Sequence, residues 1–188
     1  MVGDVVDIDT PRRLFVGVAV DNEARHTLAH ALQIAGVEMI GKPVPPKSWH
    51  VTLRFLGLTS PVVQDLFMRE LEETISVAPF TLRLHTIGSF PRSDKATVLW
   101  LGADGGDALA ILGAQCEAAA EVVGFEPEGR PFVPHLTLSR IRPPADVREL
   151  TRIEIPAIRT KVDRVTLFRS YSGAGGVVYE PVDEIMLG

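Results

Sequence analysis

The sequence has little cysteine and no long hydrophobic run. Its one cysteine, Cys116, excludes an internal disulfide and a thiolate metal cluster, as is usual in a reducing compartment. The longest apolar runs, such as residues 14–20, are too short to cross a bilayer, and the first residues lack the basic start of a signal peptide. These absences predict a cytoplasmic protein without a membrane partner.

Positive charge is also scarce. The formal net charge is -5, and lysine occurs only at positions 42, 47, 95 and 161, so most of the 19 basic residues are arginines. Proteins that coat long nucleic acids rely on many contacts to phosphates, which this charge argues against. A local basic cleft is still compatible with it, and the planar guanidinium group of arginine suits phosphate recognition.

Hydrophobic periodicity predicts strands and helices that mingle without strict βαβ alternation. Strands are expected over residues 14–20, 50–57, 80–84, 97–101, 135–140, 162–168 and 177–182. Helices are expected after Asp21, after Ser60-Pro61, over residues 109–123 and briefly over 145–150. Residues 1–11 are expected as a lead-in, 42–47 as a Pro-rich loop and Gly173 to Gly176 as a turn. The pattern predicts an α+β protein, one bilobal domain over residues 1–188 with similar, intertwined lobes corresponding roughly to 12–95 and 96–188.

A near-identical tetrapeptide occurs once in each half of the chain. The two copies are His50-Val51-Thr52-Leu53 and His135-Leu136-Thr137-Leu138. Side chains alternate across a strand, so each copy places a histidine and a threonine on one face and two apolar residues on the other. If the lobes are related by a pseudo-twofold axis, two imidazoles and two hydroxyls converge on one cleft of phosphate size.

These four side chains suit the cleavage of a cyclic phosphodiester. The reaction needs a base for the attacking water and an acid for the departing ribose oxygen, and histidine serves as either near neutral pH. Threonine hydroxyls donate to the non-bridging oxygens, where charge builds up in the transition state. One His-x-Thr is common on strands by chance, but two copies in comparable places favour a catalytic site that requires no metal.

Longer segments around both motifs resemble the two-histidine phosphoesterases, and among them the RNA 2',3'-cyclic phosphodiesterases, also called 2'-5' RNA ligases. The segments that carry the resemblance span nearly the whole chain: Arg13–Phe15, Trp49–Gly57, Gly88–Pro91, Leu99–Leu101 and Arg130–Arg140. The resemblance implies a bilobal fold, no cofactor, and hydrolysis of an RNA 2',3'-cyclic phosphate end to a 2'-phosphate. It also implies that His50 is the proton donor and His135 the proton acceptor, roles that the two near-symmetric motifs do not themselves distinguish.

Three further residues are candidates for substrate binding. By strand alternation Arg54 shares the face of His50 and Thr52, so it is interpreted either as a phosphate ligand or as a surface arginine. Arg130 lies in the loop that leads to His135, within reach of a phosphate. Phe132 is expected either to stack on a base or to pack under its own loop.

Strict alternation assigns the remaining residues of both motifs to other roles. Phe55 is expected to point to the core with Val51 and Leu53. Arg140 falls on the face opposite His135, which predicts a structural role unless the strand bulges there.

His26 and His30 are four residues apart on a helix, but residue 27 is threonine, so they are interpreted as surface residues and not as a zinc pair.

Three other functions compete with hydrolysis of a cyclic phosphate. The same residues could instead join a 2',3'-cyclic end to the 5'-hydroxyl of another RNA, which is ligation through a 2'-5' bond, or cleave 2'-5' linked oligonucleotides. From a different class, the protein could be a non-catalytic module that binds RNA ends. Nothing in the sequence demands more than a monomer.

Overall fold

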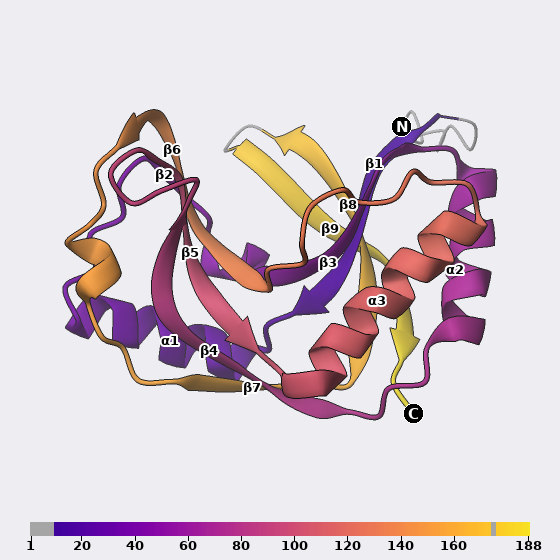
Figure 1. The fold of residues 1–188 in the computed structure, drawn as a ribbon, viewed down its shortest axis with the longest axis horizontal. Coiled ribbons are helices and arrows are strands. Elements are labelled where there is room, and N and C mark those ends of the chain that lie inside the picture. Colours follow the sequence, from indigo (N-terminus) through magenta and orange to yellow (C-terminus); the bar gives the residue numbers. More distant parts are fainter. Residues whose placement is uncertain (1–9, 174–175) are drawn as a thin grey trace, which may run out of the picture.

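One antiparallel sheet runs through the protein, with three helices on its outer sides (Figure 1). The computed structural model describes residues 10–173 and 176–188. Most of the predicted lead-in over residues 1–11 and the centre of the predicted turn at Gly173–Gly176 lie outside these described residues. The α+β class predicted from the sequence is confirmed.

The strands are β1 (Arg12–Ala19), β2 (Lys42–Pro43), β3 (His50–Thr59), β4 (Phe80–Phe90), β5 (Ala96–Asp104), β6 (His135–Ala145), β7 (Ile158–Val162), β8 (Arg164–Gly173) and β9 (Gly176–Met186). The helices are α1 (Asn22–Ile34), α2 (Pro61–Thr74) and α3 (Gly106–Val122), with 3-10 turns η1 (Pro46–Ser48) and η2 (Leu150–Arg152). The order across the sheet is β7-β4-β5-β6-β3-β1-β8-β9, and β2 pairs with β6.

The sheet has two similar halves that meet where β3 pairs with β6. We call β1, β3, β8 and β9 the first lobe, and β2 with β4 to β7 the second lobe. The segment β1-α1-β3 has its counterpart in β5-α3-β6, since each is a strand, a helix and a strand that carries one His-x-Thr motif. Each of these two helices covers the lobe that does not contain its neighbouring strands. The helix α1 packs on β7 of the second lobe, and α3 packs on β3 of the first lobe and on α2 (Figure 1).

Local sequence signals explain where the helices begin. The Asp21 carboxylate accepts a hydrogen bond from the Ala24 N–H at 2.8 Å, and the Ser60 hydroxyl accepts one from the Val63 N–H at 3.4 Å. Both are side-chain caps that satisfy N–H groups left unpaired at a helix start. Asp21 also accepts a hydrogen bond from Thr160 on β7 at 2.6 Å, which fixes α1 to the second lobe.

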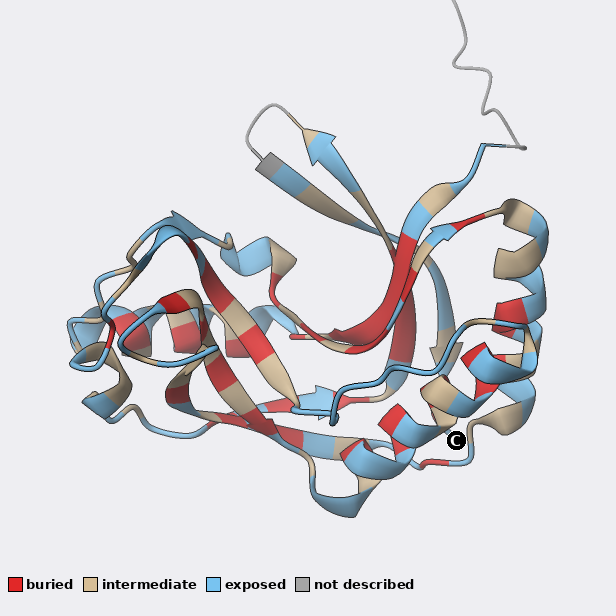
Figure 2. Ribbon diagram, turned by 45° about the horizontal axis from the view of Figure 1, so that its top comes forward, coloured by how far each residue is buried: buried red, intermediate tan, exposed pale blue. Residues whose placement is uncertain are grey.

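Buried residues run along the central strands and along the inner faces of the helices, whereas the outer helix faces are exposed (Figure 2). Leu28 and Leu32 of α1 and Cys116 of α3 are buried, as their helical spacing predicts. None of the helices in the described parts of the chain is both long and apolar enough for a membrane span.

Two expectations about elements are wrong. The helical stretch expected over residues 145–150 is absent, because β6 continues to Ala145 and only a 3-10 turn follows at Leu150. The strand expected over residues 162–168 is two strands, β7 and β8, separated at Asp163. The chain leaves the second lobe there, since β7 pairs with β4 and β8 pairs with β1.

Candidate active site

The pairing of β3 with β6 brings the two His-x-Thr motifs together at the centre of the sheet. Val51 lies opposite Leu136, and both are completely buried. The neighbours of these two residues along each strand therefore point to the other face of the sheet. Those neighbours are His50, Thr52, His135 and Thr137. Because the strands are antiparallel, each histidine lies beside the threonine of the other motif.

The two imidazoles are held in the same way. His50 Nδ1 lies 2.7 Å from the carbonyl oxygen of Ser48, and His135 Nδ1 lies 2.7 Å from the carbonyl oxygen of Val133. A carbonyl oxygen only accepts, so Nδ1–H is the donor in both rings. In the neutral form of each ring, Nε2 is therefore left with its lone pair available for proton transfer.

Aromatic rings pack against both imidazoles. The ring centroids of Phe15 and Tyr179 lie 4.7 and 4.8 Å from that of His50. The ring of Phe90 meets His135 edge-on at 5.0 Å. These contacts restrict the rotation of each imidazole and remove water from part of its surface.

Burial makes both histidines poor bases in the free protein. It is the largest cause that lowers the pKa of His50 from 6.5 to about 4, with smaller contributions from the positive charges of Arg140 and His135. Burial also lowers the pKa of His135, and Arg140 again adds to the effect. The hydrogen bonds to Ser48 and Val133 oppose these shifts without cancelling them. Both rings are therefore mainly neutral at pH 7 before an anion binds.

Arg140 lies on the side of the histidines, because β6 contains the bulge that is the exception to its predicted structural role. Leu138 and Ser139 are both buried, so the alternation of β6 skips one residue and Arg140 reaches the face of His135. The pairing of β5 with β6 shifts register between Leu99 and Trp100 at this point, which marks a β-bulge. The sequence gives no local sign of this bulge, which is why Arg140 is misplaced by counting.

The same irregularity occurs in β3 and reverses the expectations for Arg54 and Phe55. Leu53 and Arg54 are both buried, and the pairing of β1 with β3 shifts register between Val16 and Gly17. Phe55, expected in the core, is instead 54% exposed. It occupies in the first motif the position that Arg140 occupies in the second, five residues after the histidine.

Arg54 is 8% exposed, and its guanidinium group is engaged within the protein. Nε lies 2.5 Å from the Glu117 carboxylate, and the terminal nitrogens donate to the carbonyl oxygens of Phe55 and Glu126. Glu117 also accepts a hydrogen bond from the Glu128 N–H at 2.7 Å. Arg54 thus fastens the loop that leads to His135 onto α3. These contacts agree with neither interpretation from the sequence, the phosphate ligand or the surface arginine.

Arg130 and Phe132 lie in that same loop, which covers residues 123–134. Arg130 is exposed and forms an ion pair with Glu128 at 3.1 Å. Phe132 is 41% exposed, and its ring packs on Gly113 of α3, where an added Cβ would lie 2.9 Å from a ring carbon. Their assignment to substrate binding stays a prediction.

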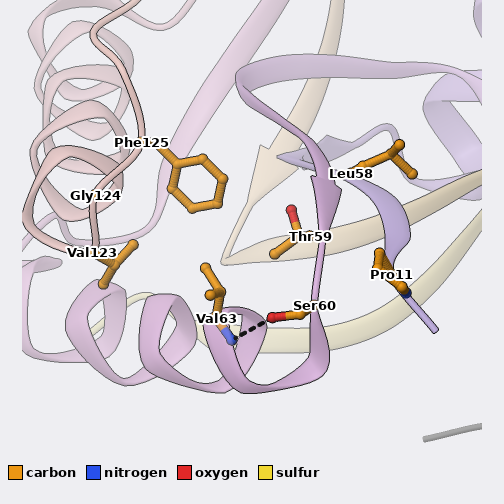
Figure 3. A pocket seen from close by; sticks show the side chains of 8 residues that line it. All are labelled: Pro11, Leu58, Thr59, Ser60, Val63, Val123, Gly124 and Phe125. Atoms are coloured by element: carbon orange, nitrogen blue, oxygen red, sulfur yellow. Dashed lines mark hydrogen bonds between the residues drawn. The ribbon is translucent and has the colours of Figure 1, made fainter. Parts of the chain in front are cut away.

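A pocket of about 470 Å³ lies away from the histidines, at the far end of β3 (Figure 3). It is lined mainly by apolar side chains from the ends of β3, α2 and α3, including Leu58, Val63 and Phe125. No titratable side chain lines it, so it offers no acid–base chemistry. Within residues 10–173 and 176–188, no three metal-ligating side chains of His, Cys, Asp or Glu gather at one place.

Comparison with known proteins identifies the family. Residues 22–174 match the profile described as the 2'-5' RNA ligase superfamily, so the chain belongs to this superfamily, a group of two-histidine phosphoesterases. It is 32% identical over 170 residues to the RNA 2',3'-cyclic phosphodiesterase of Aeropyrum pernix, and this alignment covers 86% of this chain and 91% of that protein. It is 30% identical over 175 residues to the Escherichia coli protein of the same name, covering 92% and 94% of the two chains.

A solved structure agrees with this assignment. The crystal structure of Escherichia coli LigT complexed with 3'-AMP matches with a TM-score of 0.78 at 28% identity. The match covers 94% of this chain and 98% of that chain, so the bilobal fold implied by the sequence resemblance is confirmed.

Proposed function

We propose that this protein hydrolyses the 2',3'-cyclic phosphate at the end of an RNA to a 2'-phosphomonoester, without a metal ion. The observation that carries the proposal is the pairing of two His-x-Thr motifs across β3 and β6, with both Nε2 atoms available for proton transfer. The names of the relatives support the same substrate.

In the proposed mechanism His135 is the proton acceptor and His50 the proton donor. His135 Nε2 removes a proton from a water molecule, whose oxygen attacks phosphorus. The bond from phosphorus to the 3'-oxygen breaks, and His50 protonates that oxygen. Thr52 and Thr137 donate hydrogen bonds to the non-bridging oxygens, and the charge of Arg140 offsets the negative charge that accumulates there.

This mechanism requires one protonated histidine, whereas burial favours two neutral ones. The negative charge of the bound cyclic phosphate favours the imidazolium form, so substrate binding raises the pKa of both rings. His50, whose pKa is about 4 in the free protein, then acquires its proton together with the substrate. The protonation of His50 is therefore coupled to the binding of the substrate.

The test is turnover of an oligoribonucleotide ending in a 2',3'-cyclic phosphate, in the presence of EDTA. We expect the parent protein to open the ring to a 2'-phosphate. We expect His50→Ala and His135→Ala to lower kcat by about 100-fold to 10,000-fold each, the usual contribution of a general acid or base. His30→Ala, a change on the exposed side of α1, is the matched control and should retain the parent rate.

Other outcomes favour other functions. A parent protein that is inactive in EDTA, or variants that retain activity, would contradict the two-histidine mechanism. Binding of the RNA end without turnover by the parent would indicate a non-catalytic module. A longer product formed with an RNA that carries a 5'-hydroxyl would indicate 2'-5' ligation, and cleavage of 2'-5' linked oligonucleotides would indicate the third alternative.

We further propose that Phe55 contacts the nucleobase, as is expected of Phe132, while Arg130 remains a candidate for contacting a phosphate. Phe55 is exposed on the same face of the sheet as His50, and its ring lies 5.8 Å from that of Phe15, which packs on His50. An exposed aromatic ring beside a phosphate site suits stacking on an unpaired base.

A further inference from the structure

Three basic side chains form a strip that begins at the catalytic histidines and continues along the second lobe. They are Lys42 on β2 and Arg140 and Arg142 on β6, and we call them the basic strip. Lys42 lies directly opposite Arg140 in the register of β2 and β6. The strip therefore combines two adjacent strands at one side of the active site.

All three side chains lie on the face that carries His135 and Thr137. Ile141 is buried between the two arginines, so Arg140 and Arg142 share the opposite, exposed face. Residues directly opposite in an antiparallel pair share a face, which places Lys42 beside Arg140. Strand geometry places Arg142 about 7 Å beyond Arg140 along β6, so the strip extends away from the histidines.

The charges of the strip have no counterion within the described parts of the chain. Several other arginines there form ion pairs, as Arg148 does with Asp146 at 2.6 Å and Arg164 with Glu184 at 2.9 Å. Like charges directly opposite each other destabilise a strand pair, and Lys42 and Arg140 are such a pair. The repulsion between Lys42 and Arg140 is reduced when an anion binds beside them, although the protein as a whole has a net charge of -5.

The opposite lobe lacks the matching charge at the corresponding place. Phe55 stands in the first motif where Arg140 stands in the second. Anions are therefore favoured on the side of the second lobe, and an aromatic ring is offered on the side of the first. This asymmetry gives the otherwise similar lobes different affinities for the parts of a nucleotide.

We propose that the basic strip beyond Arg140, at Lys42 and Arg142, binds the phosphodiester groups of an RNA strand on the 5' side of the cyclic phosphate, so that the protein favours oligonucleotides over mononucleotides. This inference rests on the proposed function. A cyclic phosphate occupies both the 2'- and the 3'-oxygen of the last ribose, so the strand continues only through the 5'-oxygen. The next anions along the RNA are its phosphodiesters, and the nearest unpaired cations along β6 are those of the strip.

The test compares a nucleoside 2',3'-cyclic phosphate with a tetranucleotide that ends in the same group, at several salt concentrations. We expect kcat/KM for the tetranucleotide to be at least ten-fold higher at low salt. Its logarithm should fall with the logarithm of salt concentration, with a slope of about -0.7 for each phosphate contacted. The double variant Lys42→Ala with Arg142→Gln should lose most of this advantage and of this slope, and should affect the mononucleotide far less.

The control is the double variant Arg69→Gln with Arg159→Gln, which removes two exposed arginines on α2 and β7, outside the strip. It should retain the preference for the longer substrate. Equal kcat/KM for both substrates in the parent protein, or an unchanged preference in the strip variant, would overturn the proposal while leaving hydrolysis of the mononucleotide in place.

Binding measured without turnover separates the strip from the proposed function. The probe is a fluorescent tetranucleotide that ends in a 3'-phosphate, titrated with the parent protein and with both double variants. Weaker binding by the strip variant alone, by ten-fold or more, supports the strip even if no cyclic phosphate is hydrolysed. Equal binding by the strip and control variants contradicts it, whatever the activity of the protein.

Discussion

The positive charge of Arg140 acts on the protonation of both histidines. Burial is the largest cause that lowers the pKa of His50 and of His135, and the positive charge of the Arg140 guanidinium group lowers both pKa values further. In the proposed function the same positive charge attracts the phosphate anion, whose negative charge raises the pKa of the histidines. In the free protein burial is the main reason that both rings are neutral, and Arg140 adds to its effect. A phosphate anion bound as proposed would offset the contribution of Arg140.

Replacing Arg140 by glutamine is expected to raise the pKa of both histidines, because a positive charge that opposes imidazolium formation is removed. The measurement is a titration of the imidazole C–H signals by NMR in the free protein. The alkaline limb of kcat/KM, which reports the free enzyme, should move to higher pH in the same variant, while its maximum falls because a phosphate contact is lost.

Arg159→Gln, a change at an exposed position of β7, provides the control and should leave both titrations unchanged. Histidine titrations that stay in place after Arg140→Gln, or move to lower pH, would show that Arg140 does not act on the rings through its charge.

At the scale of elements, the sequence predicts most of the strands and helices but misses β2, which lies in the loop predicted over residues 42–47, and it fails at the bulges. The period of two over His50–Leu53 and His135–Leu138 correctly places four catalytic candidates on one face. One extra residue in each strand then moves the residues that follow it to the opposite face from the one that alternation predicts. Phe55 and Arg140 are therefore exposed on the side of the histidines, and Arg54 is buried. The bulges depend on pairing with β1 and β5, strands distant in sequence, and local periodicity does not contain that information.

The strand β2 is held on β6 by close backbone packing at Gly41. Ser139 donates a hydrogen bond to the Ile40 carbonyl, and the Val44 N–H donates to the Leu138 carbonyl at 2.8 Å. Gly41 has a φ of +83°, and an added Cβ would lie 2.5 Å from the Arg140 carbonyl oxygen. Only glycine allows both this conformation and this approach.

Gly41→Ala is therefore expected to lower the free energy of unfolding by about 3 kcal/mol, the sum of the left-handed backbone conformation and the overlap with β6. Gly36→Ala is the matched control, since Gly36 also has a positive φ, +67°, but no atom lies within 4 Å of an added Cβ. It should cost about 1 kcal/mol. Urea denaturation of the two variants measures the difference, and equal losses would show that the approach of Gly41 to β6 is unimportant.

At the scale of the whole molecule, the internal repeat of the sequence corresponds to the two lobes, but the sequence does not contain their junction. The repeat predicts that two histidines face one cleft. It does not predict that Val51 pairs with Leu136, that α1 and α3 each cover the opposite lobe, or that β8 and β9 join the first lobe. Those features depend on contacts between residues far apart in the chain, which the hydrophobic pattern of each segment leaves open.

The near-twofold arrangement leaves the acid and the base chemically alike, so their roles depend on how the substrate lies between the lobes. A substrate in which sulfur replaces the bridging 3'-oxygen separates them, because a thiolate is a much weaker base than an alkoxide and departs without a proton. If His50 is the acid, His50→Ala should be impaired about 100-fold or more on the oxygen substrate and recover most of the parent rate on the sulfur substrate. His135→Ala should stay impaired on both, because water still requires a base. Recovery by His135→Ala instead would mean that the two lobes exchange roles, and recovery by neither variant would mean that leaving-group protonation does not limit the reaction.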